Sequence, residues 1–172
     1  MERKKKISKE RRMQQANRNL EFLLKGYDRL DNSLAVTPPH YRMQDIKNLP
    51  SEIQKDVKTI FKEYNNNSFT GECYDISTLS IIIFYILGSG ANVIEDNDYY
   101  IWTPYDETII NHLPIRFGIR DLTGHDEAKG LGSEPHIHIH ENKKSKEINY
   151  GYETTKFIGK NLHVMVRQDE YY

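Results

Sequence analysis

Apolar residues recur at helical spacing in three stretches of the first half of the chain. Leucines on one face predict a helix over residues 8–30, and a second apolar stripe predicts a helix over 51–64. The nearly uninterrupted apolar run Ile81–Leu87 predicts a third helix at the centre of the core, beginning near Thr70 or Gly71. The β-branched residues of that run would also suit a buried strand.

After residue 90 the pattern changes to short alternating segments separated by turns, which is typical of strands. The order of helices first and strands second predicts an α+β fold, with N-terminal helices followed by an antiparallel sheet of about five short strands. Residues 104–112 are expected to form a short helix or a loop. The strand-like segments are 91–94, 99–103, 115–122, 136–141, 147–152, 156–158 and 162–168.

Residues 31–50 contain three prolines and favour a linker between two units. We therefore expect a basic helical arm at 1–30, a Pro-containing linker at 31–50 and a single α+β domain at 51–172. The single cysteine excludes an internal disulfide, and no signal peptide is recognisable. The longest apolar run is far shorter than the roughly 20 residues that a membrane span needs. We expect a cytoplasmic protein that does not enter a membrane.

Charge is distributed unevenly along the 172 residues. Residues 1–30 carry ten Lys and Arg against four Asp and Glu, which leaves fourteen against twenty-one in the rest. A basic arm is typical of a segment that meets nucleic acid or an acidic partner. A solubilising helix, or an arm folded back on the acidic body, would show the same asymmetry. The candidate binding residues are Arg3, Lys4, Lys5, Lys6, Lys9, Arg11, Arg12 and Arg18 in the arm, and Tyr99, Tyr100 and Asp106 in the body.

Three of the seven histidines alternate with isoleucines between residues 136 and 140. Successive side chains of a strand point to opposite faces, so we expect His136, His138 and His140 on one face. Neighbouring positions on a face are about 6.5–7 Å apart, so two imidazoles can reach one zinc ion but three in a row span too far. We expect His136 and His138 as the metal ligands. Further ligands would come from His125, Asp126, Glu134 or His163.

The alternative interpretation places the isoleucines against the core and the histidines on a solvated polar face. A histidine-rich strand without a cysteine or a carboxylate at fixed ligand spacing is more often such a surface. We favour this alternative, under which no cofactor is expected.

Four segments between residues 134 and 159 follow one another in a characteristic order. They are Glu134-Pro135-His136-Ile137-His138-Ile139, the turn at Lys143 and Lys144, and the segments 146–149 and 155–159. Over residues 115–159 the chain resembles a family of small uncharacterised bacterial domains with a strand of the type Glu-Pro-(Pro)-His-x-His-Val. In that family the strand pairs with the strand that follows it, and the genes often lie beside toxin–antitoxin-like partners. The resemblance implies a hairpin and an importance of His136 and His138, but no activity.

Cys73 lies where the third helix is expected to begin. The positive end of a helix lowers the pKa of a thiol and favours the nucleophilic thiolate. The segment 71–77 locally resembles the cysteine helix of transglutaminase-like and papain-like folds. That resemblance implies a catalytic Cys73 with a histidine from later in the chain, His138 or His163. Free cysteines are among the most buried residues, so we favour an inert thiol in the core.

These features favour a non-enzymatic binding protein over an enzyme. The abundance of Asn, Ile, Lys and Tyr is typical of a phage or mobile-element gene. We expect the basic helix and the acidic, Tyr-rich body to engage or inhibit a nucleic-acid-handling machine of host defence. The partner would be a protein, a ribonucleoprotein, or nucleic acid bound through residues 1–30. The alternative is a metal-dependent or Cys-His hydrolase with its site at the strand 136–140.

Overall fold

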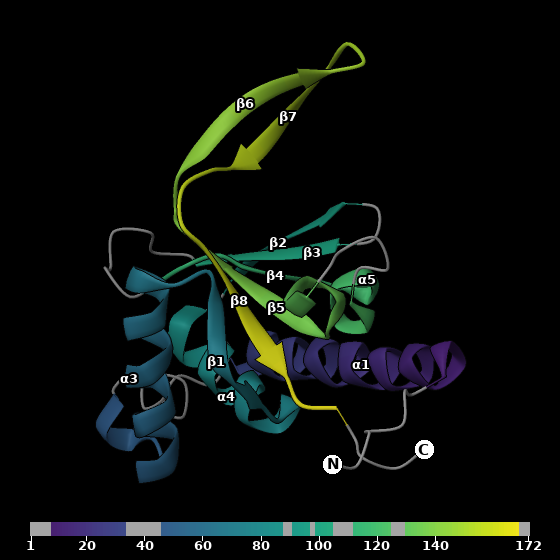
Figure 1. Ribbon diagram of the computed structural model, residues 1–172. Helices are drawn as coiled ribbons and strands as arrows, with labels where there is room; N and C mark the ends of the chain where they lie inside the picture. Colours follow the sequence, from purple (N-terminus) through teal and green to yellow (C-terminus); the bar gives the residue numbers. More distant parts are fainter. Residues whose placement is uncertain are drawn as a thin grey trace.

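The computed structural model describes residues 8–33, 46–87, 91–96, 99–104, 112–124 and 130–168 (Figure 1). The helices among them are α1 (Lys9–Ser33), α3 (Ser51–Asn66), α4 (Ile76–Leu87) and α5 (Ile119–Thr123), with 3-10 turns at Ile46–Asn48 and Gly130–Ser133. The strands are β1 (Phe69–Tyr74), β2 (Ala91–Asp96), β3 (Tyr99–Pro104), β4 (Ile115–Gly118), β5 (His136–His140), β6 (Lys144–Asn149), β7 (Tyr152–Phe157) and β8 (Asn161–Val166).

Six strands form one mixed sheet in the order β1-β8-β5-β4-β3-β2. Its neighbours are antiparallel except β1 and β8, which run parallel. Strands β6 and β7 pair with each other in a separate ribbon, which stands clear of the sheet in Figure 1. This architecture confirms the predicted α+β class. The sheet is mixed rather than purely antiparallel because of β1.

Strand β1 occupies the place where we expected the third helix to begin, so that expectation is wrong. Thr70 and Tyr74 are buried in this strand, and the helix α4 begins only at Ile76. The register with β8 shifts between Phe69 and Cys73. At the shift the backbone N–H of Met165 donates to Oγ1 of Thr70, at 3.0 Å, instead of to a carbonyl. Pairing with the last strand of the chain therefore overrides the local helical pattern.

Helix α4 lies at the centre of the core, as the sequence predicted. Its residues Leu79, Ile82, Ile83, Ile86 and Leu87 are at most 1 % exposed. They share one cluster with the apolar residues of β5 and β8. Figure 1 shows α1, α3 and α4 on one side of the sheet and the ribbon β6–β7 on the other.

In the described part of the chain no helix is long and apolar enough to cross a membrane.

Helix α1 belongs to the folded body through its inner face. Ala16 and Leu23 are buried in the common core, and Leu20 and Leu24 pack against it. The guanidinium of Arg12 donates to the backbone carbonyls of Thr123 and Ser133, at 2.8 and 2.5 Å. Most of the expected linker lies outside the described residues, so the division into arm, linker and domain stays a prediction.

Candidate metal centre

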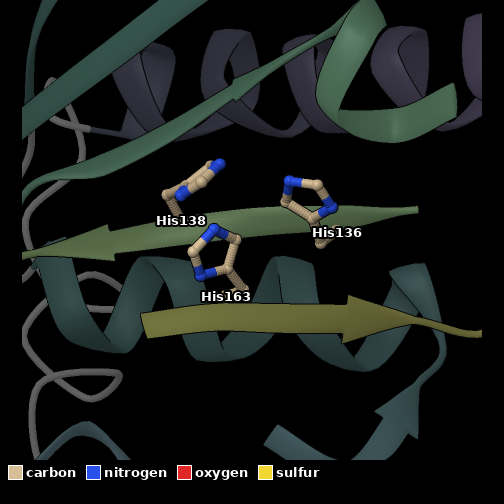
Figure 2. A group of neighbouring side chains, drawn as sticks. All are labelled: His136, His138 and His163. Carbon is tan, nitrogen blue, oxygen red and sulfur yellow. The ribbon is translucent and has the colours of Figure 1, made fainter. Parts of the chain in front are cut away.

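Three histidines come together on the face of the sheet that is turned away from α4. His136 and His138 alternate along β5 with Ile137 and Ile139, which belong to the core on the opposite face. His163 of β8 is the direct cross-strand partner of His138, and such partners share a face. The ring centroids of His138 and His163 lie 4.4 Å apart, and those of His136 and His138 lie 4.8 Å apart (Figure 2).

The expectation of a solvated histidine face is wrong. His136, His138 and His140 are 0, 3 and 7 % exposed. Helix α5 covers the strand from one side with Asp121, and Phe157 at the end of β7 stacks on the His140 ring at 5.6 Å. Both faces of β5 are therefore buried.

His136, His138 and His163 form a group that could hold a metal ion. One ring nitrogen from each lies within 4.8 Å of one from each of the others. The group takes two histidines from the strand 136–140 and leaves out His140, as the spacing argument predicted. The third member is His163, one of the candidates for completing the set.

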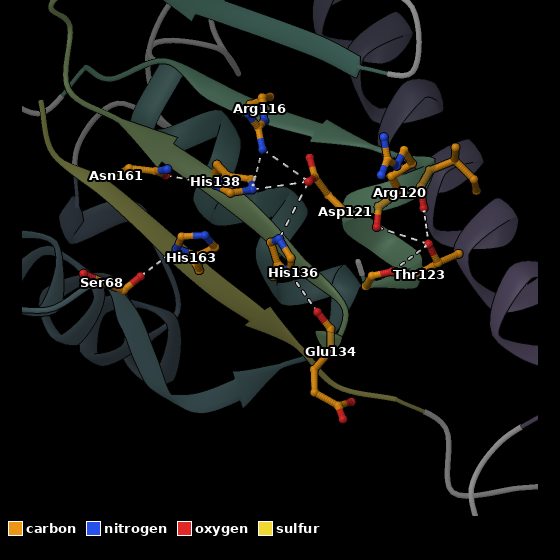
Figure 3. Close-up of polar contacts among 12 residues, drawn as sticks. Ser68, Arg116, Arg120, Asp121, Thr123, Glu134, His136, His138, Asn161 and His163 are labelled. Atoms are coloured by element: carbon orange, nitrogen blue, oxygen red, sulfur yellow. Dashed lines mark hydrogen bonds and ion pairs between the residues drawn. The ribbon is translucent and has the colours of Figure 1, made fainter. Parts of the chain in front are cut away.

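Nδ1 of each of these three rings lies against an oxygen acceptor (Figure 3). Nδ1 of His136 lies 2.7 Å from the Glu134 carbonyl, and Nδ1 of His163 lies 2.9 Å from the Ser68 carbonyl. Nδ1 of His138 lies 2.9 Å from Oδ1 of Asn161. An acceptor at Nδ1 fixes the tautomer with its proton there, so Nε2 keeps its lone pair. Metal-binding histidines are normally oriented in this way.

Asp121 and Arg116 complete the polar cluster. Oδ1 of Asp121, which is fully buried, lies 3.3 Å from Nε2 of His138 and 3.7 Å from Nε2 of His136. Nη2 of Arg116 lies 3.3 Å from the same oxygen and 2.7 Å from Nε2 of His138. A guanidinium can only donate, so Nε2 of His138, the nitrogen that would face a metal, accepts the hydrogen bond from Arg116.

Burial favours the neutral form of three imidazoles, those of His136, His140 and His163. Desolvation lowers the pKa of His136 to about 4 and that of His140 to about 3, and the neighbouring His138 lowers both further. The pKa of His163 is lowered for the same reasons. Burial alone would raise the pKa of Asp121, but its contact with His138 and the charge of Arg116 outweigh it and hold this pKa at about 2. Neutral imidazoles and an ionised carboxylate are the forms that bind a divalent metal.

An open pocket of about 420 Å³ adjoins the cluster at the junction of α3 and β8. Its lining includes His163 and Asn161 from the cluster, together with Lys160. The remaining lining residues are Tyr64, Asn65, Asn66, Asn67, Ser68 and Gly159. Among the three histidines of the group, His163 is the one that borders this pocket.

Cys73 is exposed and lies on β1, not at a helix start in the core. The expectation of a buried thiol is wrong, and so is the helix that was to activate it. Cys73 pairs with Met165, and Met165 pairs with His136 on the next strand. Cys73 and His136 are thus two strands apart, about 9–10 Å. That arrangement gives no support to a direct Cys73–His138 pair.

The other predicted site residues have varied positions. Lys9, Arg11 and Arg18 are exposed on α1, whereas Arg12 binds the backbone carbonyls of Thr123 and Ser133. Tyr99 lies under Arg116, with the guanidinium carbon 4.7 Å from the ring centroid, and Tyr100 stacks on Phe117. Glu134 contributes its backbone carbonyl to the cluster, while its carboxylate binds Gln168. The remaining predicted site residues lie outside the described residues: Arg3, Lys4, Lys5, Lys6, Asp106, His125 and Asp126.

Sequence reasoning missed Arg116, Asp121 and Asn161. Arg116 interrupts the apolar pattern of β4, and its cross-strand partner is His138. Asn161 similarly faces His140 across β5 and β8. In the sequence these residues could be noticed only as polar residues within strand-like segments. The strand pairing is needed to show that they lie beside the histidines.

Comparisons with protein-family models, with curated proteins and with solved structures found no match. The two local resemblances, over residues 115–159 and around Cys73, therefore stay predictions.

Proposed function

We propose that this protein is a metal-dependent hydrolase in which His136, His138 and His163 bind a zinc ion. The observation that carries the proposal is the shared orientation of the three rings. Each Nδ1 lies against an oxygen acceptor. One nitrogen of each ring lies within 4.8 Å of a nitrogen of each of the other two rings. Three oriented imidazoles are a ligand set that zinc uses in catalytic sites.

The open side of the cluster favours catalysis over a structural role. Structural zinc sites are closed by four protein ligands, whereas catalytic sites keep a position for water or substrate. His163 borders the pocket of about 420 Å³, so a small molecule can reach this ligand from solvent. A bound zinc ion would supply a water molecule of lowered pKa.

Arg116 and Asp121 then have separate roles. The lone pair on Nε2 of His138 cannot accept from Arg116 and bind a metal at the same time. Metal binding thus releases an Arg116 N–H, which can donate to an anionic oxygen of a substrate. Asp121 lies against both β5 ligands and can accept a proton or add an oxygen ligand.

The experiment is metal analysis of protein purified without a histidine tag. We expect about one zinc ion per chain. His136→Ala, His138→Ala and His163→Ala should each weaken zinc binding by more than about tenfold, since the loss of a group that merely orients a ligand already costs about 10–100-fold. His112→Ala, at a buried histidine outside the group, is the matched control. Hydrolysis of a chromogenic phosphodiester or ester should stop with chelator and return with zinc.

A folded protein that binds no zinc at micromolar concentration would contradict the proposal. Equal zinc affinity in the three variants and the control would contradict it as well.

A second candidate is the non-enzymatic binding protein that the sequence favoured. Its support is the outer face of α1, where Lys9, Arg11 and Arg18 are exposed. Inhibition of a host-defence enzyme and a phage or mobile-element origin stay predictions from composition.

A further inference from the structure

The ribbon β6–β7 presents large apolar side chains at the end that is farthest from the body. Figure 1 shows the ribbon rising from the sheet to a free tip. Ile148, Tyr150 and Tyr152 near that tip are 79, 94 and 75 % exposed. Exposed apolar groups gathered in one place are typical of binding sites.

The turn at the tip holds a tyrosine in an unfavourable backbone conformation. Tyr150 and Gly151 have φ angles of 51° and 83°. A two-residue turn of this kind normally takes Asn-Gly or Asp-Gly, because most side chains disfavour positive φ. A strained residue whose side chain is almost fully exposed is better explained by contact with a partner than by folding.

The ribbon and its base are also basic. Residues 141–160 contain five lysines and three glutamates in a chain whose net charge is −1. The strand pairing and the alternation along β6 place Lys144, Lys146 and Ile148 on one face. Lysines that track a phosphate backbone, beside aromatic rings that stack on bases, are the combination used to bind single-stranded nucleic acid.

The lysine-bearing face leads to the histidine cluster. Nζ of Lys144 lies 5.6 Å from the centroid of the Phe157 ring. That ring stacks on His140 at 5.6 Å, and His140 stacks on His138 at 5.7 Å. The lysine-bearing face of the ribbon is therefore linked to the histidine cluster through the Phe157 and His140 rings.

We propose that the ribbon β6–β7 is a binding arm for single-stranded nucleic acid, with Tyr150 at the tip stacking on a base and Lys144 and Lys146 contacting phosphates. The base of this arm adjoins the histidine cluster through Phe157. The binding step rests on the ribbon alone and needs no metal, so it stands or falls separately from the hydrolase proposal.

The test is fluorescence anisotropy of a labelled 20-nucleotide single-stranded DNA with the full chain, treated with chelator. Tyr150→Asn removes the stacking ring and should weaken binding by roughly 5–150-fold. Asn suits the positive φ of position 150, so the turn should persist. Lys144→Gln with Lys146→Gln should reduce the salt slope of the association constant by about 1.4. Lys55→Gln with Lys58→Gln on α3 removes the same charge from exposed positions away from the ribbon and is the control.

Circular dichroism and the melting temperature check that each variant folds. Unchanged affinity of folded Tyr150→Asn, or equal losses in the two lysine pairs, would overturn the proposal. Tighter binding to a duplex of the same length, or equal competition by polyglutamate, would also overturn it, in favour of a groove-binding ribbon or an acidic protein partner. Normal DNA binding by a protein that binds no zinc would support the arm and reject only the metal centre.

Discussion

Acidification should destabilise the metal-free protein well above the pH at which ordinary carboxylates become protonated. The reason is the burial of His136 and His140, which lowers their pKa values to about 4 and about 3. In the unfolded chain both would titrate near 6.5. Asp121, Arg116 and the rings of His138 and His163 surround them.

The direction of the effect follows from proton binding. Between pH 6.5 and 4 the unfolded chain binds protons that the folded chain does not, so stability falls as the pH falls. Each histidine contributes a loss of about 1.4 kcal/mol per pH unit, or about 2 kcal/mol at pH 5 relative to neutral pH. The two together amount to about 4 kcal/mol, a large part of the 5–15 kcal/mol that stabilises a typical domain. Asp121, whose pKa is lowered to about 2, adds its own loss only below about pH 4.

The assay is urea denaturation of chelator-treated protein at pH 7.5, 6 and 5, followed by circular dichroism. His140→Phe is the informative variant, because it keeps an aromatic ring against Phe157 but removes one titrating group. Its loss of stability between pH 7.5 and 5 should be smaller than that of the wild type by about 2 kcal/mol. A wild type equally stable at pH 7.5 and 5, or a variant with an unchanged pH dependence, would refute the reasoning.

Two further predictions concern residues at the surface. Because the side chain of Cys73 is exposed, folded protein should react with one equivalent of iodoacetamide at this residue. For the same reason Cys73→Ser should change the free energy of unfolding by less than about 0.5 kcal/mol. A thiol that reacts only after urea has unfolded the chain would contradict this. Replacing Lys9, Arg11 and Arg18 by Gln should preserve the fold and lower the salt slope of single-stranded DNA binding by about 0.7 for each phosphate that α1 no longer neutralises. An unchanged slope by fluorescence anisotropy would show that α1 is not part of the nucleic-acid surface.

The histidine cluster was half predictable from the sequence. Period-two alternation placed His136, His138 and His140 on one face before any partner strand was known. Their burial was not predictable, because it depends on α5 and on Phe157, which fold back over β5. A strand shows its alternation locally, whereas the element that covers it is chosen by tertiary packing.

The misassigned start of α4 has a similar cause. The segment 69–74 pairs with β8, and its hydrogen bond between Thr70 and Met165 joins residues 95 positions apart. No window of neighbouring residues contains that information. The apolar residues of α4 itself predicted the correct helix, because burial on nearly all sides is visible in composition alone.

The place of the ribbon in the chain connects the binding arm to the proposed metal centre. His140 and Asn161 are cross-strand partners, so β5 and β8 could be joined at this point by a short turn. The chain instead inserts residues 141–160 there and fixes their base. A carboxylate oxygen of Glu141 accepts from the backbone N–H of Lys160 at 2.9 Å. Gly159, at φ 94°, leaves no room for a Cβ beside that carboxylate. The base of the ribbon is thus tied to the two strands that carry the histidines, while Tyr150 at the tip stays exposed for binding.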